Sequence, residues 1–134
     1  MSKIVRFAAA AAATTAIAIA PMSAVSADEM TLPYGGSLQL SVVQSGPESQ
    51  STVTLNCNPN GGNHPQVEQA CDQLTNHSGQ VAEIGAGDAM CMMKYEPVTV
   101  RAKGIWRGET LNYTDTFSNR CVAVRDTGGV LFDF

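Results

Sequence analysis

Four segments of the chain alternate apolar and polar residues, which is the pattern of strands that bury one face. The apolar positions are Leu38, Leu40 and Val42, then Val53, Leu55 and Cys57, then Val98, Val100 and Ala102, then Leu111, Tyr113 and Phe117. Turn-forming residues at 46–49 and 107–109 separate the members of each pair, so the pattern predicts two hairpins. A fifth strand is predicted over residues 130–134, at the end of the chain.

A helical period replaces this alternation between residues 66 and 77. Apolar side chains recur at i, i+3, i+4 and i+7, as Val67, Ala70, Cys71 and Leu74, and Gly79 follows as a stop signal. A second, short helix is predicted near 120–124. These elements predict one small α+β domain, with an antiparallel sheet of about five strands and one or two short helices on one face.

The first 27 residues have the features of a secretory signal peptide. Lys3 and Arg6 precede an alanine-rich apolar stretch, and Val25-Ser26-Ala27 matches a small-residue cleavage site. A membrane anchor is the weaker reading, because the apolar stretch is short for a bilayer. We therefore expect residues 1–27 to be removed and residues 28–134 to form a secreted, extracellular domain.

The charge balance narrows the possible partners. Without Lys3 and Arg6 the predicted mature chain keeps all 12 acidic residues but loses two of the 8 basic ones, which gives a net charge of −6. Nucleic acids and anionic membranes both attract basic surfaces, so we expect neither as a partner.

All four cysteines lie in the predicted mature chain, and an even number in an exported domain is typical of disulfides. Of the three possible pairings we favour the sequential one, Cys57 with Cys71 and Cys91 with Cys121, because each bridge then closes a local loop. A zinc site is disfavoured, because there is no C-x-x-C pair and His64 and His77 are not at ligand spacing.

No constellation of catalytic residues stands out. His64 and His77 are the only histidines, both in polar loop or helix-end contexts, and no G-x-S-x-G turn or phosphate-binding loop is present. With the cysteines paired, no thiol remains as a nucleophile. We therefore expect no enzymatic activity, no cofactor and no metal, and we expect Trp106 to fill the core or an interface.

Residues 91–98 form an unusual segment, because Met92 and Met93 stand beside a cysteine in a predicted loop. One interpretation is strand core, although adjacent residues of a strand point to opposite faces, so only one could be buried. The other is a peptide displayed to another protein. A disulfide at Cys91 and the restricted backbone at Pro97 would stiffen it on both sides, as a protease inhibitor requires.

Several motifs together resemble the Streptomyces subtilisin inhibitor family across nearly the whole predicted mature chain. They are Leu55-Asn56-Cys57-Asn58-Pro59, Gly62-Asn63-His64-Pro65, Ala70-Cys71, Cys91-Met92-Met93-Lys94-Tyr95-Glu96-Pro97-Val98, Gly104-Ile105-Trp106-Arg107-Gly108, Phe117-Ser118-Asn119-Arg120-Cys121 and Phe132-Asp133-Phe134.

The resemblance implies a secreted inhibitor of subtilisin-like serine proteases with sequential disulfides. It implies a reactive bond between Met93 (P1) and Lys94 (P1′), with Cys91, Met92 and Tyr95 in the protease-binding loop. Asn119 has two interpretations, as a hydrogen-bonding support behind the loop or as a simple turn or helix-cap residue.

The resemblance also implies a homodimer, and we expect Leu40, Val42 and Val100 to line the open face of the sheet. Two positions depart from the family pattern, since Met92 replaces a frequent proline and Lys94 replaces a small apolar residue. Three alternatives stay open: a trypsin inhibitor with Lys94 as P1, a metalloprotease inhibitor acting through another surface, and a secreted binding protein without inhibitory activity.

Overall fold

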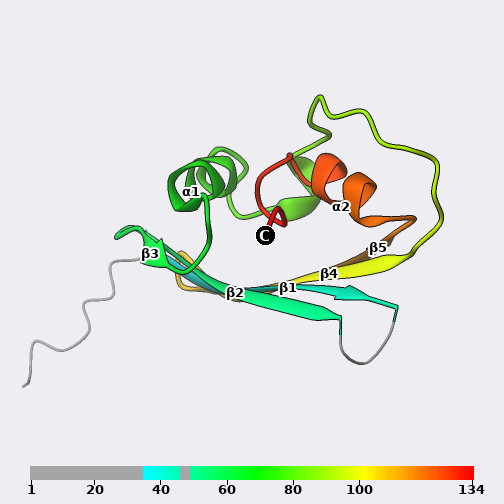
Figure 1. Ribbon diagram of the computed structural model, residues 1–134. Helices are drawn as coiled ribbons and strands as arrows, with labels where there is room; N and C mark the ends of the chain where they lie inside the picture. Colours follow the sequence, from blue (N-terminus) through cyan, green and yellow to red (C-terminus); the bar gives the residue numbers. More distant parts are fainter. Residues whose placement is uncertain (1–34, 46–48) are drawn as a thin grey trace, which may run out of the picture.

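The structure, a computed structural model, describes residues 35–45 and 49–134 (Figure 1). The predicted signal peptide, residues 1–27, lies outside the described residues, as do residues 28–34 and residues 46–48 of the predicted turn. The boundary between signal peptide and mature domain therefore stays a prediction. None of the helices in the described ranges is long and apolar enough to cross a membrane.

Five antiparallel strands form a single sheet, in the order β3-β2-β1-β4-β5. Their bounds are β1 Gly36–Gln44, β2 Gln50–Cys57, β3 Gly61–Gly62, β4 Val98–Trp106 and β5 Glu109–Phe117. Leu40 of β1 lies opposite Val53 of β2 and Ala102 of β4, so apolar positions of neighbouring strands coincide across the sheet. The two predicted hairpins are thus confirmed, and β1 and β4 join them at the centre.

The helices cover one face of this sheet (Figure 1). Helix α1 spans Val67–Asn76, the short 3₁₀ helix η1 spans Val81–Glu83, and α2 spans Arg120–Asp126. Helix α1 buries Ala70, Cys71 and Leu74, three of the four positions that the helical period selected. The predicted α+β class, with helices on one side of an antiparallel sheet, is confirmed.

The predicted strand at residues 130–134 is wrong, and the two-residue strand β3 supplies the fifth strand instead. The end of the chain turns back between the helices and the sheet, where Leu131 and Phe132 are both fully buried. Phe132 stacks on Tyr113 of β5, with ring centroids 6.4 Å apart. Two neighbouring side chains are both enclosed here because the segment lies between two layers, whereas a strand on a one-sided sheet buries alternate residues.

His64 lies in the core and not in a polar loop context, contrary to the sequence interpretation. Only 4% of the residue's surface is exposed, and Nδ1 accepts a hydrogen bond of 2.9 Å from the Gln66 backbone N–H. Nε2 lies 3.0 Å from the Leu131 carbonyl oxygen and therefore carries the proton that it donates. These two hydrogen bonds attach the end of the chain to the segment before α1.

The predicted lining of the open face is also wrong. Leu40, Val42 and Val100 point toward the helices and are at most 2% exposed, so they belong to the core. The opposite face of the sheet carries mainly hydroxyl, amide and basic side chains. Its exposed members include Ser37, Gln39, Thr52, Thr54, Arg101, Lys103, Ile105, Asn112, Thr114 and Thr116.

Trp106 is a core residue, which confirms the first of the two alternatives expected for it, core or interface. Only 5% of its surface is exposed, and its indole packs directly against Gly79, whose φ is +76°. A side chain at Gly79 would overlap the indole ring, so the glycine after α1 both ends the helix and admits the tryptophan.

Candidate functional site

A long connection without helix or strand joins η1 to β4 and arches away from the body of the molecule (Figure 1). It comprises residues 85–97, and we call it the display loop. Loops longer than about 12 residues without secondary structure are uncommon in compact domains and are usually functional. The display loop is therefore the first candidate for a functional site.

Large apolar side chains of the display loop face solvent. The exposed fraction is 98% for Met90, 86% for Met92, 102% for Met93 and 79% for Tyr95. The strand-core interpretation of Met92 and Met93 is therefore wrong for both residues. Met90, which the sequence reading did not single out, belongs to the same group. Holding so much apolar surface in water costs free energy that burial would recover, which is typical of a surface that binds a partner.

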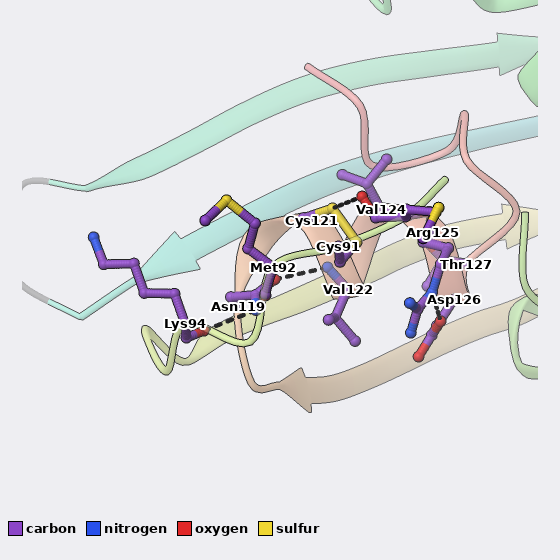
Figure 2. Close-up of a disulfide and its surroundings, with 11 residues drawn as sticks. Cys91, Met92, Lys94, Asn119, Cys121, Val122, Val124, Arg125, Asp126 and Thr127 are labelled. Carbon is purple, nitrogen blue, oxygen red and sulfur yellow. Dashed lines mark hydrogen bonds and ion pairs between the residues drawn. A yellow bond between two sulfur atoms is a disulfide. The ribbon is translucent and has the colours of Figure 1, made fainter. Parts of the chain in front are cut away.

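The disulfide Cys91–Cys121 ties the display loop to the first turn of α2 (Figure 2). The second disulfide joins Cys57 at the end of β2 to Cys71 of α1. The predicted sequential pairing is thus confirmed, and no free cysteine remains among the described residues. Cys91 fixes the loop backbone two residues before Met93.

Asn119 supports the display loop from behind and caps α2 at the same time (Figure 2). Its side-chain amide donates hydrogen bonds to the Met92 carbonyl oxygen at 3.2 Å and to the Lys94 carbonyl oxygen at 2.8 Å. Its Oδ1 accepts a hydrogen bond of 2.9 Å from the Val122 N–H, which is the geometry of a helix N-cap. Loop support and helix capping, which the sequence left as alternatives, are therefore both roles of Asn119. The NH₂ group of its amide supports the loop, and the oxygen of the same amide caps the helix.

The Met93 carbonyl lies between the two carbonyls that Asn119 holds. Within the described residues no hydrogen bond is made to the Met93 oxygen, whereas both neighbouring oxygens are held by one side chain. A single amide that donates to both flanking carbonyls fixes the backbone around Met93. It also leaves the Met93 oxygen free to accept hydrogen bonds from a partner.

Further contacts hold the C-terminal half of the display loop, among them a hydrogen bond of 3.3 Å from the Ser45 hydroxyl to the Pro97 carbonyl oxygen. The Glu96 N–H donates to the Ser118 carbonyl oxygen at 2.8 Å, which continues the attachment of the loop to the segment before α2. Lys94 Nζ lies 2.8 Å from Glu96 Oε1, but both side chains are well exposed, so this ion pair contributes little stability.

A hollow lies at the other end of the sheet, away from the display loop. It has a volume of about 540 Å³ and is lined by Gly35, Pro59, Ile105 and their neighbours. No cluster of residues that could hold a metal ion occurs in residues 35–45 and 49–134. The exposed display loop remains the candidate site because of its exposed apolar side chains, and its chemistry is that of a peptide offered to another molecule.

Comparison with known proteins agrees with this geometry. The model of the family described as "Subtilisin inhibitor-like" matches residues 35–119. The chain is 36% identical over 127 residues to a subtilisin inhibitor of Streptomyces violaceus, and the match covers 89% of this chain and 87% of that protein. It is 38% identical over 118 residues to subtilisin inhibitor-like protein 4 of Streptomyces lavendulae, covering 86% of this chain and 95% of that protein.

A solved structure is similar over most of the fold. It is the crystal structure of Streptomyces caespitosus sermetstatin in complex with Bacillus licheniformis subtilisin, with a TM-score of 0.60 and 28% sequence identity. The match covers 75% of this chain and 99% of that chain. A similar fold thus occurs in a protein whose crystal structure is a complex with subtilisin.

Proposed function

This chain belongs to the subtilisin inhibitor-like family, and from that premise we propose that it inhibits subtilisin-like serine proteases by presenting the display loop as a substrate. The reactive bond of the proposal joins Met93 (P1) to Lys94 (P1′), with Cys91, Met92 and Tyr95 as contacts on either side. As a member of a family of protease inhibitors the chain is not an enzyme, in agreement with the sequence analysis.

The observation that carries the proposed bond is the hydrogen bonding of Asn119. A serine protease attacks a carbonyl carbon while its oxyanion hole binds the oxygen, so the attacked oxygen has to be free. The Met93 oxygen satisfies this condition, whereas the Lys94 oxygen already accepts a hydrogen bond of 2.8 Å from Asn119. The register with Lys94 as P1, which would favour trypsin, is disfavoured for the same reason.

The exposed side chains fit the same register. Met93 is an unbranched apolar side chain that projects fully into solvent, and burial in a protease pocket would remove it from water. Met90 then occupies P4 and Met92 occupies P2. The backbone around Met93 is part of no strand and would be available to pair with the protease as an added strand.

The contacts behind the loop explain how a substrate-like peptide would resist release after cleavage. If the Met93–Lys94 bond is cut, the Cys91–Cys121 bridge retains the acyl side, while Asn119 and the Glu96–Ser118 hydrogen bond retain the amine side. The new amine stays near the acyl carbon at a high effective concentration, so religation competes with hydrolysis. A loop held before binding also loses less conformational entropy on association.

An inhibition titration tests the proposal. The mature chain is titrated against subtilisin, chymotrypsin, trypsin and a metalloprotease, with the variants Met93→Asp and Ile105→Asp. We expect stoichiometric nanomolar inhibition of subtilisin, a loss of at least about 100-fold in Met93→Asp because an aspartate is unfavourable in an apolar pocket, and no change in Ile105→Asp. Ile105 is an exposed apolar residue remote from the loop, so it controls for the added charge.

Mass spectrometry of the slowly cleaved inhibitor locates the bond. Cleavage between Met93 and Lys94 is expected, and cleavage after Lys94 would contradict the register. Absence of inhibition of any serine protease at micromolar concentration would overturn the function itself, and inhibition of the metalloprotease alone would point to another surface.

Secretion and a homodimer complete the proposal. Secretion is supported by the signal-peptide features of residues 1–27 and by the family resemblance, whereas the homodimer rests on the resemblance alone. A mature N-terminus at Asp28 in protein from the culture medium would support export, and sedimentation equilibrium would measure the dimer. If the dimer forms through the open face of the sheet, its contacts are Gln39, Thr52 and Arg101 and their neighbours, because Leu40 and Val42 are enclosed in the core.

A further inference from the structure

The methionines of the described chain are concentrated in the display loop. Of the six methionines in the sequence, Met1, Met22 and Met30 lie outside the described residues, and the other three are Met90, Met92 and Met93. The buried hydrophobic residues of the core include no methionine. Thioethers, which usually fill irregular gaps in cores, are here placed where they are most accessible to solvent.

This placement makes the display loop the part of the described residues that is most susceptible to oxidation. The thioethers of Met90, Met92 and Met93 belong to side chains that are at least 86% exposed, and the cysteines of the described chain are all in disulfides. A peroxide oxidant therefore finds its reactive sulfur atoms, within residues 35–45 and 49–134, in the loop alone. Oxidation susceptibility of methionine follows accessibility, so all three are open to attack.

We propose that the display loop is a methionine oxidation site, and that conversion of Met93 to its sulfoxide switches off protease inhibition. The inference rests on the proposed function, because it takes Met93 as the side chain that enters the protease pocket. Hydrogen peroxide transfers one oxygen atom to the thioether: the O–O bond breaks, an S–O bond forms, the sulfur is oxidised, and the peroxide is reduced to water.

Oxidation to the sulfoxide changes the polarity of the Met93 side chain but leaves the contacts that hold the display loop in place. None of the hydrogen bonds that hold the loop uses a methionine sulfur, since Asn119 and Ser118 bind backbone groups. The new S=O dipole must instead be desolvated when Met93 enters an apolar pocket, where it finds no designed partner. We expect the inhibition constant for subtilisin to rise about 10- to 100-fold after oxidation of Met93.

The experiment compares the mature protein before and after hydrogen peroxide, with the oxidant removed before the assay. Peptide mapping measures oxygen addition at each methionine, and a titration measures subtilisin inhibition. Met93→Leu keeps an apolar P1 residue of similar size without a thioether, and Met92→Leu is the matched control one position away. We expect peroxide to weaken the wild type and Met92→Leu and to leave Met93→Leu unaffected.

A second arm uses the preformed complex with subtilisin. Because the P1 side chain is enclosed by the protease, Met93 should be protected from peroxide in the complex and oxidised in the free inhibitor. Methionine sulfoxide reductase should restore inhibition to the oxidised protein. Unchanged Trp106 fluorescence and an unchanged melting temperature would show that the core has not been altered.

The outcomes separate the two proposals. An untreated chain that does not inhibit subtilisin would overturn the proposed function and this inference together. An untreated chain that inhibits, and that inhibits equally well with Met93 fully converted to sulfoxide, would overturn the oxidation switch alone. Loss of inhibition in oxidised Met93→Leu would also overturn it, by assigning the effect to another residue.

Discussion

The two disulfides have almost the same span, with Cα–Cα distances of 5.5 Å for Cys57–Cys71 and 5.6 Å for Cys91–Cys121, but their surroundings differ. Cys57 and Cys71 are each 4% exposed and join α1 to β2 inside the core. Cys91 is half-buried and Cys121 is exposed, and their bridge holds a loop that buries little of its own surface. The first bridge reinforces packing, whereas the second takes the place of packing.

This difference shows how one small domain can have a stable core and also hold an exposed loop in a defined conformation. Where side chains interlock, as Phe132 does between β5 and the helices, apolar burial positions the backbone. In the display loop the large apolar side chains are exposed to solvent and cannot serve that purpose. A covalent bridge, two hydrogen bonds donated by the Asn119 amide and one accepted by the Ser118 carbonyl oxygen hold the backbone there instead.

The largest contrast is expected from removing each disulfide in turn. In the chain-entropy model both double variants, Cys57→Ala/Cys71→Ala and Cys91→Ala/Cys121→Ala, lose about 3–4 kcal/mol of stability. Inhibition should nevertheless survive in the first variant at temperatures where it stays folded, and should become rapid cleavage in the second. Thermal unfolding and the time course of proteolysis measure the two effects. Equal inhibition by both variants would contradict the division of roles.

An intermediate effect on inhibition is expected from substitutions of Asn119, which can separate the support of the loop from the capping of α2. Asn119→Asp keeps an oxygen acceptor for the Val122 N–H but removes the donors to the Met92 and Lys94 carbonyls. We expect faster cleavage of the reactive bond with a nearly unchanged melting temperature. Asn119→Ala should show the same faster cleavage and also lose about 1 kcal/mol of stability through the missing cap. If both variants are cleaved as slowly as the wild type, the amide does not support the loop.

The smallest effect concerns Tyr113, in the packed half of the molecule. Partial burial, followed by the charge of Asp115 and a hydrogen bond to it, raises the pKa of Tyr113 from 10.0 to about 12. The folded protein then retains a phenolic proton that the unfolded chain releases, so this contribution to stability is complete below pH 10 and is lost as the pH rises toward 12.

Ultraviolet absorbance of the phenolate, with Tyr113→Phe to identify its signal, measures this titration. Asp115→Asn should lower the pKa of Tyr113 toward 10 without reaching it, because the burial remains. Subtilisin inhibition at neutral pH should not change in Asp115→Asn, since the carboxylate lies outside the display loop. A Tyr113 pKa that is the same with and without Asp115 would leave burial as its only cause.

Much of the fold follows from local patterns. Alternation at Leu38, Leu40 and Val42 and at Val98, Val100 and Ala102 predicted strands, because a period of two has one structural interpretation over several residues. The helical period around Cys71 placed that cysteine within reach of Cys57, and short sequence separation favoured the correct disulfide pairing. The display loop was visible in the sequence as two methionines beside a cysteine.

The sequence by itself determined which residues share a face, which segments pair locally, and which peptide is unusual. Only the tertiary structure decided that the helices cover the face of Leu40 and Val42, and that the segment around Phe132 folds inward instead of adding a strand. It also showed that His64 is buried and that one Asn119 amide both caps a helix and holds two carbonyls. Local periodicity shows that a strand or helix has an apolar face. The groups that pack against that face come from segments far away in the chain, so they are specified only when the layers pack.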